Sequence, residues 1–219
     1  MAIDRWLLEQ HQTGNQPPSL RFYTWSRTAI SLGYHQHKYP ETWQNLTWQG
    51  EKIDIVQRPT GGRAVLHQGD LTYSVVTSGI SGSRIQMYQK ICEFLIQGWR
   101  SLGVELDYGQ AGRGYIHNPN CFGTATGADL VTVDGAKLIG SAQLTSNGAI
   151  LQHGSMRLHS NPDLFALVFG AESFTSVQLP QSLTIEKIIE ALIAAAIDCF
   201  GIQFEMRELS VNEMKMILD

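Results

Sequence analysis

The chain has 219 residues, of which 43% are hydrophobic and 16% charged, a profile that indicates a globular protein and excludes a disordered or fibrous one. Its 16 basic and 20 acidic residues give a net charge of −4, which argues against a general nucleic-acid-binding protein. Three widely spaced cysteines without a CxxC pair predict no disulfide framework and no cysteine zinc site, and they fit a reducing cytoplasm. No apolar run reaches the ~20 residues of a membrane span, so we expect neither membrane nor nucleic acid as a partner.

The first half of the chain predicts a short helix followed by strands. Apolar residues at helical spacing predict an amphipathic helix over residues 2–11. Runs of β-prone residues then predict five short strands, at 22–25, 29–33, 53–58, 64–67 and 71–77. A glycine-bearing loop, Pro59 to Arg63, joins the third of these strands to the fourth.

The second half begins with a change of apolar period. It predicts a long helix over 84–102 that ends at Gly103. Asp134-Gly135 and Asn147-Gly148 are typical of type I′ hairpin turns, and they predict a meander of strands at 129–133, 137–146 and 149–158. A helix over 185–200 and a last strand over 202–206 follow. This order predicts an α+β fold with a mixed, mostly antiparallel sheet and packed helices, in one domain of residues 1–219.

The segment QRPTGGRAVLH is the first candidate site. Gly61 and Gly62 permit a tight turn and a close approach of the backbone, whose free N–H groups could bind a carbonyl or phosphate oxygen. Arg58 and Arg63 add positive charge on either side, and His67 closes the segment. An ordinary hairpin loop with two turn glycines explains the same pattern, and periodicity alone favours it. Neither a P-loop nor a dinucleotide-binding fingerprint is present in the sequence.

The segment DGAKLIGSAQ is the second candidate. Its turn places Lys137 at the start of a returning strand, where a period of two predicts that Lys137, Ile139 and Ser141 share a face. Gly140, Ser141 and Ala142 are small, so that a substrate chain could lie against them. A solvated lysine at a strand end is the commoner arrangement for this residue type.

The third candidate is Cys121, in the segment HNPNCFG, which lies outside any periodic segment. Cys92 and Cys199 fall on apolar helix faces, and we expect them to be inert core thiols. A loop cysteine could be a nucleophile where a nearby cation favours its thiolate, although an unreactive thiol is the commoner case. The histidines show neither HExxH nor a carboxylate cluster, so no metal site is predicted.

Four strings stand in order along the chain: RPTGGRAVLH, DLTYS, DGAKLIGSAQ and GAILQHGSM. Together they resemble the lipoate/octanoate branch of the biotin/lipoate protein ligase superfamily. The ligases of that branch typically have GGG, whereas GGR and VLHQ here are more similar to its cysteine-dependent octanoyltransferases of the Gram-positive type. Those enzymes carry a Cys-Phe pair before the lysine motif, and Cys121-Phe122 matches it, 16 residues before Lys137.

The resemblance implies a class II biotin/lipoate ligase-like catalytic domain that acts as an octanoyltransferase in lipoate biosynthesis. Cys121 would take an octanoyl (or lipoyl) group from acyl carrier protein as a thioester, and a lysine of a lipoyl domain or of the glycine cleavage H protein would accept it. Lys137 would orient the carbonyl and handle the proton, without cofactor or metal. Substrate would be bound by the glycine loop and the lysine strand, at Arg58, Gly61, Gly62, Arg63, His67, Gly140, Ser141 and Ala142.

Three alternatives to octanoyl transfer from a carrier protein stay open. An ATP-dependent lipoate–protein ligase would use Lys137 to bind an acyl-adenylate, and it would need ATP and Mg but no cysteine. Bacterial ligases of this kind usually append an accessory domain, so the chain length favours the transferase. An octanoyl amidotransferase acting between lipoyl domains shares the cysteine chemistry, and a non-catalytic binder of acyl groups or carrier domains would keep the motifs without activity. The sequence does not indicate an oligomeric state.

Overall fold

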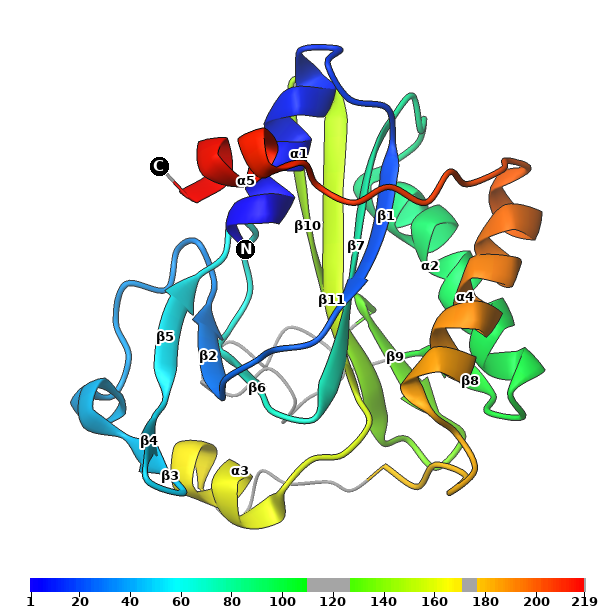
Figure 1. Cartoon of the computed structure of the whole chain (residues 1–219). Helices are drawn as coiled ribbons and strands as arrows, with labels where there is room; N and C mark the ends of the chain where they lie inside the picture. Colours follow the sequence, from blue (N-terminus) through cyan, green and yellow to red (C-terminus); the bar gives the residue numbers. More distant parts are fainter. Residues whose placement is uncertain (110–126, 171–176, 219) are drawn as a thin grey trace.

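The computed structural model describes residues 1–109, 127–170 and 177–218. Within these residues the largest sheet has six strands, all paired antiparallel (Figure 1). In spatial order they are β1 (Ser19–Tyr23), β7 (Asp70–Ser78), β11 (Ala149–Arg157), β10 (Lys137–Ser146), β9 (Asp129–Thr132) and β8 (Leu106–Tyr108). The neighbouring positions of β9, β10 and β11 confirm the predicted meander, and the large sheet confirms the mostly antiparallel α+β class.

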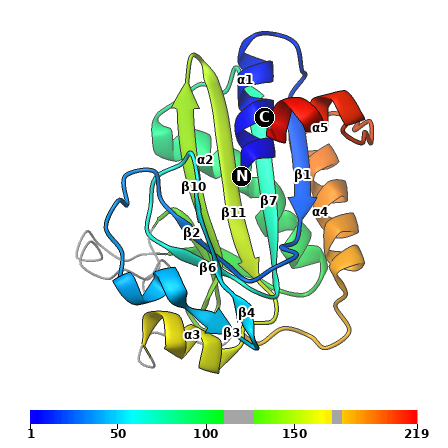
Figure 2. The same ribbon diagram turned by 60° about the vertical axis from the view of Figure 1, so that its left-hand side comes forward.

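A smaller, mixed sheet and helix α1 lie on one side of the large sheet (Figure 2). In the smaller sheet β2 (Ala29–Leu32) runs parallel to β5 (Asp54–Gln57) and antiparallel to β6 (Val65–His67). Helix α1 (Ala2–Gln12) buries Trp6, Leu7 and Leu8 against apolar side chains of β7 and β11. The structure also has 3-10 helix η1 (Glu41–Asn45), strands β3 (Thr47–Trp48) and β4 (Glu51–Lys52), helix α3 (Pro162–Phe169) and helix α5 (Val211–Leu218).

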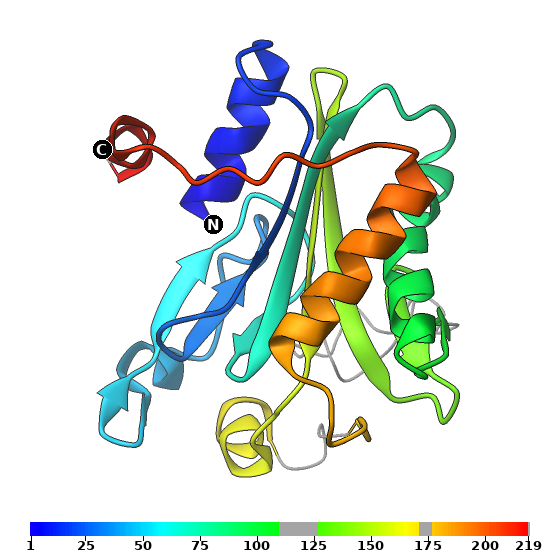
Figure 3. The same ribbon diagram turned by 45° about the vertical axis from the view of Figure 1, so that its right-hand side comes forward.

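Helices α2 (Arg84–Ser101) and α4 (Ile185–Phe200) cover the other side of the large sheet (Figure 3). Their residues join those of β7, β10 and β11 in the main hydrophobic core. A Cβ atom at Gly98 of α2 would lie 2.8 Å from a methyl group of Leu192 on α4, so the glycine lets the two helices pack closely. Both helices confirm the sequence prediction, and α2 begins with a capping box of Ser83 and Gln86.

The glycine loop between β5 and β6 is not a hairpin, because β2 lies between these two strands. The loop instead crosses the end of β2, where the N–H of Tyr34 donates to the carbonyl of Thr60 over 2.8 Å. At this crossing a Cβ atom on Gly33 would overlap the carbonyl oxygen of Gly62. Gly62 itself has a φ of +98°, whereas Gly61 has no other group within 4 Å of a Cβ atom. The close contact therefore requires glycine at positions 33 and 62 but not at 61.

Two predictions of local structure are wrong. Residues 202–206 form an exposed segment that is not paired with any described strand, so the expected last strand is absent, and helix α5 follows this segment. The turn at Asp134-Gly135 is not type I′, since φ is positive at Gly135 but not at Asp134. Asp134 there accepts a hydrogen bond from the hydroxyl of Thr132, which stabilises a longer connection. The turn at Asn147-Gly148 has positive φ at both residues, as type I′ requires.

The crossing predicts different costs for three alanine substitutions. Gly33→Ala should lower the free energy of unfolding by about 1–3 kcal/mol, because its Cβ displaces a backbone carbonyl. Gly62→Ala should lower the free energy of unfolding by about 1 kcal/mol or more, because φ is positive at this position. Gly61→Ala should change it by no more than about 0.5 kcal/mol. Urea unfolding of the three variants checks this order, and equal losses at Gly61 and Gly33 would contradict the role of the crossing.

Candidate functional site

A small cavity of about 50 Å³ lies where the smaller sheet faces the large one. The smaller-sheet side contributes Ser31, Val65 and the residues predicted from the glycine loop, Arg58, Gly62 and His67. The large sheet contributes the predicted small residues Gly140, Ser141 and Ala142, together with Thr72 of β7 and His153, Gly154 and Ser155 of β11. The structure thus brings together six of the eight predicted binding residues. We call this cavity, with the residues that line it, the cleft.

Arg58 is buried and holds the glycine loop in shape. Its guanidinium donates to the carbonyl of Arg63 over 2.7 Å, to that of Gly61 over 2.9 Å and to that of Ser31 over 2.8 Å. Gly61 and Arg63 are the two predicted binding residues outside the cleft. Their carbonyls contact Arg58, which lines it. Because Arg58 binds the loop, its positive charge is fixed beside Ser31, whose hydroxyl also accepts from it over 3.2 Å.

His67 is the centre of a buried hydrogen-bond chain that runs from Ser31 to Asp70. Its Nε2 lies 2.8 Å from the Ser31 hydroxyl, and its Nδ1 lies 2.8 Å from the Asp70 carboxylate. The indole of Trp25 stacks on the imidazole at a centroid distance of 3.9 Å. Ser31 and Asp70 are functional candidates that the sequence analysis missed. An (i, i+3) spacing of His and Asp was visible, but nothing in the sequence joined Ser31 to them.

A second chain of the same kind links Thr60, His153 and Asp4. His153 Nε2 lies 2.6 Å from the Thr60 hydroxyl, and its Nδ1 lies 3.2 Å from the Asp4 carboxylate, which Arg21 and Tyr23 also bind. Burial holds the pKa of His153 below its usual value, although Asp4 acts in the opposite direction. Burial would raise the pKa of Asp4, but the hydrogen bond from His153 and the charge of Arg21 outweigh it and lower that pKa to about 2.

Lys137 is buried at the start of β10 and forms an ion pair with Asp129 of β9 over 2.8 Å. The register of β10 against β9 shifts between Lys137 and Ile139, and both Leu138 and Ile139 enter the core under α2. This bulge breaks the period of two, so Lys137 does not share a face with Ile139 and Ser141 as predicted. It lies instead on the face of the sheet opposite α2, as does Asp129, whose neighbour Leu130 is in the core.

Of the three cysteines, Cys121 lies outside the described residues, so its role stays a prediction. Cys92 is fully buried, which confirms its place in the core, and burial raises the pKa of its thiol to about 12, which disfavours the thiolate. It receives a hydrogen bond from Gln152, which also binds the hydroxyl of Tyr73. That hydroxyl in turn donates to Ser141 over 2.8 Å, so the predicted substrate strand is supported from the core side.

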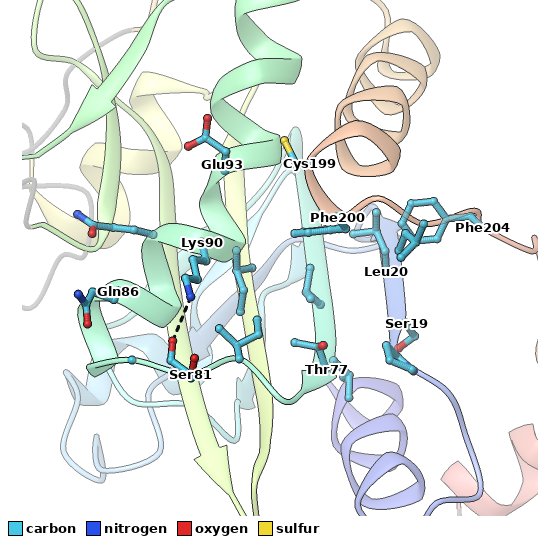
Figure 4. Close-up of a pocket in the computed structure, with 18 of the residues that line it drawn as sticks. Ser19, Leu20, Thr77, Ser81, Gln86, Lys90, Glu93, Cys199, Phe200 and Phe204 are labelled. Carbon is cyan, nitrogen blue, oxygen red and sulfur yellow. Dashed lines mark hydrogen bonds between the residues drawn. The ribbon is translucent and has the colours of Figure 1, made fainter.

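A much larger cavity, of about 1040 Å³, lies on the other side of the large sheet, at the edge formed by β1, α2 and the end of α4 (Figure 4). Apolar side chains such as Leu20 and Phe200 line it, and Lys90 at its rim donates to the carbonyl of Ser81. Cys199 lies half-buried on this cavity, so it is less enclosed than the predicted core thiol. None of the predicted site residues that the structure describes lines this cavity, so the cleft is the candidate active site.

Two further observations concern metal ions and membranes. In residues 1–109, 127–170 and 177–218, no group of three or more His, Cys, Asp or Glu side chains is arranged to hold a metal ion. No helix among the same residues is long and apolar enough to cross a membrane.

The lowered pKa of His153 predicts a loss of stability in mild acid. An unfolded histidine binds a proton below about pH 6.5, whereas folded His153 stays neutral to lower pH. The unfolded state then holds more protons. The free energy of unfolding should therefore decrease as the pH is lowered, by up to about 1.4 kcal/mol per pH unit. Chemical unfolding between pH 5 and 7.5 measures this slope, which His153→Asn should reduce. His35→Asn, at an exposed position, is the control, and equal slopes in both variants would argue against the assignment.

Comparison with known proteins places these features in a family. The family model for the lipoyl protein ligase A/B catalytic domain matches residues 1–197. The octanoyltransferase LipM of Kyrpidia tusciae is 34% identical over 240 residues, which cover 97% of this chain and 86% of the relative. LipM of Carboxydothermus hydrogenoformans is 33% identical over 236 residues, which cover 99% and 87%.

A solved structure agrees with this assignment. A protein of T. acidophilum described as a lipoate protein ligase, with lipoic acid bound, superposes with a TM-score of 0.79 at 25% identity and covers 99% of this chain and 86% of its own. Its similarity extends over the whole fold described above, including the strands that form the cleft. The chain therefore belongs to the lipoyl protein ligase A/B catalytic domain family, as the sequence motifs indicated.

Proposed function

We propose that this protein is an acyltransferase that transfers octanoyl groups in lipoate biosynthesis. The observation that supports this most strongly is the similarity to LipM octanoyltransferases over nearly the full chain, at 34% and 33% identity. The cleft adds chemical support, because it assembles the glycine loop and the strand that follows Lys137 around one small cavity. A lipoyl domain is the acceptor that fits this activity, and octanoyl-acyl carrier protein is the donor we propose.

The proposed reaction has two acyl transfers. The Cys121 thiolate attacks the donor thioester, and the carrier thiol leaves as the enzyme thioester forms. The ε-amine of an acceptor lysine then attacks that thioester, so that a C–N bond forms, the C–S bond breaks and the cysteine thiolate is released. The ammonium of Lys137, held by Asp129, is suited to donate a hydrogen bond to the carbonyl oxygen as negative charge develops there. Backbone N–H groups of Gly61 and Gly62 are further candidates for this role, and no cofactor or metal takes part.

An ATP-dependent lipoate–protein ligase is the second candidate, because the T. acidophilum protein of the same fold was solved with lipoic acid. In that reaction Lys137 would bind an acyl-adenylate, Mg-ATP would be required, and Cys121 would be dispensable. The amidotransferase alternative keeps Cys121 as nucleophile and changes the donor to an octanoylated H protein. The three reactions therefore differ in donor and in their need for the cysteine.

Intact-mass measurements with an octanoyl donor separate the transferase from the ligase. Purified protein incubated with octanoyl-acyl carrier protein should gain the mass of one octanoyl group in an intact-mass measurement. The adduct should be absent in Cys121→Ser and should pass to a lysine of an added lipoyl domain. Incorporation of free lipoate or octanoate that depends on ATP and survives Cys121→Ser would instead establish the ligase. Octanoylated H protein in place of the carrier protein tests the amidotransferase.

Substitution of Lys137 tests the role of its buried ion pair with Asp129. Lys137→Met should slow acyl transfer about 10²–10³-fold, as expected for loss of one donor to the developing oxyanion. It should also destabilise the fold by about 3–5 kcal/mol, because Asp129 keeps a buried charge. The double variant Lys137→Met/Asp129→Asn is the matched control, since it should recover stability without activity. Recovery of both properties would show that Lys137 has only a structural role.

A further inference from the structure

The chain Ser31–His67–Asp70 has the connectivity of a proton relay, and two of its members, Ser31 and His67, line the cleft without a role in the acyl transfers proposed above. We propose that this relay removes the proton from the acceptor lysine, so that the free amine can attack the enzyme thioester. The inference rests on the proposed acyl transfer and adds the group that activates its nucleophile. Ser31 would contact the reacting amine, whereas His67 and Asp70 act through Ser31.

The need for such a base follows from the chemistry of the acceptor. A lysine ε-amine is protonated at neutral pH, with a pKa of about 10.4, and an ammonium has no lone pair with which to attack. Lys137 is not suited to accept this proton, because it is itself the cationic member of the ion pair with Asp129. A neutral imidazole is the side chain that most often accepts a proton at this pH.

The hydrogen bonds around Asp70 assign the tautomer of His67. One carboxylate oxygen, Oδ2, lies 2.6 Å from the Ser155 hydroxyl, 2.8 Å from His67 Nδ1 and 3.3 Å from the Thr72 hydroxyl. An ionised carboxylate can only accept, so Nδ1 carries the hydrogen and donates it. In the neutral imidazole that the relay needs, Nε2 is then the acceptor, and the hydroxyl of Ser31 donates to it.

Ser31 lines the cleft, and its surroundings allow its oxygen to accept a further hydrogen bond there. Its oxygen accepts a hydrogen bond from Arg58 and retains a lone pair for a further donor, such as the N–H of an incoming ammonium. The arginine also favours negative charge on this oxygen as the proton leaves it. Trp25 fixes the imidazole plane, so that little reorganisation accompanies the transfer.

The relay moves one proton from the acceptor lysine to His67 through Ser31. The lysine ammonium gives one proton to the oxygen of Ser31 while the hydroxyl proton of Ser31 passes to Nε2 of His67. Asp70 stabilises the imidazolium that results, as the acid of a Ser-His-Asp triad does. The free amine then forms the C–N bond, its second proton goes to the released cysteine thiolate, and His67 returns its proton to water after the product leaves.

The chain Thr60–His153–Asp4 provides an internal comparison. It has the same order of groups, hydroxyl, imidazole and carboxylate. However, Thr60 is not among the described residues that line the cleft, and Asp4 already forms an ion pair with Arg21. Although His153 lines the cleft, the hydroxyl of this chain therefore does not meet an incoming amine there. Thr60→Val is accordingly a matched control for Ser31→Ala, because both remove one buried hydroxyl that contacts an imidazole.

The test measures the two acyl transfers separately in the full chain. Octanoyl-acyl carrier protein is used to form the octanoyl-enzyme, which is desalted and mixed with a lipoyl domain, and both steps are followed by intact mass. In Ser31→Ala and His67→Asn, formation of the octanoyl-enzyme should be slowed far less than the transfer to lysine, so the ratio of the two rates is the readout. Transfer to lysine at pH 7 should fall about 10²-fold or more, and the deficit should shrink as pH rises toward the pKa of lysine. Hydroxylamine, which is unprotonated at pH 7, should remove the octanoyl group from these variants as fast as from the parent.

Each remaining outcome overturns the relay. Parental rates of lysine transfer in Ser31→Ala would show that its hydroxyl carries no proton, and an equal loss in both steps or with hydroxylamine would show a structural role. An equal loss of lysine transfer in Thr60→Val would remove the distinction between the two chains. Failure of the parent protein to form any octanoyl-enzyme would overturn the proposed function, and the relay with it, and this result is distinct from the others because it appears before any variant is made.

Discussion

The antiparallel pairing of β7 with β11 is the constraint on which the site depends. Alternate residues of each strand point to opposite faces, so one register fixes both the core and the cleft. Leu71, Tyr73 and Val75 of β7 enter the core beneath α2 and α4, while Asp70 and Thr72 lie on the opposite face.

Across from them, Ser155 pairs with Thr72 and His153 with Ser74. A slip of one residue would place the carboxylate of Asp70 in the hydrophobic core and remove both histidine chains from the cleft. The apolar residues that stabilise the sheet therefore also determine where the polar groups of the site lie.

Burial of charge on the cleft side imposes a second constraint. Asp4 and Asp129 are buried and form ion pairs with Arg21 and Lys137, and the buried carboxylate of Asp70 accepts a hydrogen bond from the imidazole of His67. A buried ion pair contributes little net stability, but loss of one partner is costly because it leaves an uncompensated charge. These pairs therefore favour a single arrangement of the strands and fix the orientation of the groups that would act on a substrate. The bulge in β10 belongs to the same arrangement, since it turns Lys137 toward Asp129 and away from the core.

Local sequence was sufficient for the regular elements and for the family. The helices over 84–102 and 185–200 and the meander were predictable because apolar periodicity and turn residues act within a few positions of one another. The motifs also identified the glycine loop and the strand after Lys137, most of whose residues do line one cleft. The strand expected at 202–206 is absent because a strand needs hydrogen-bond pairing with a neighbouring strand, and the local pattern does not report whether such pairing forms.

Only the tertiary structure decided which polar groups of the site are hydrogen-bonded to one another. Ser31 and His67 are 36 positions apart, and Asp4 and His153 are 149 apart, so no spacing in the chain indicates that they share hydrogen bonds. The separation of β5 from β6 by β2 turned an apparent hairpin loop into a crossing that needs Gly33 and Gly62. Composition and motifs determined what kind of domain this is, because they reflect burial and short-range conformation. The tertiary contacts determined which polar groups meet, because only the folded chain brings side chains from distant strands, or from a helix and a strand, within hydrogen-bond distance.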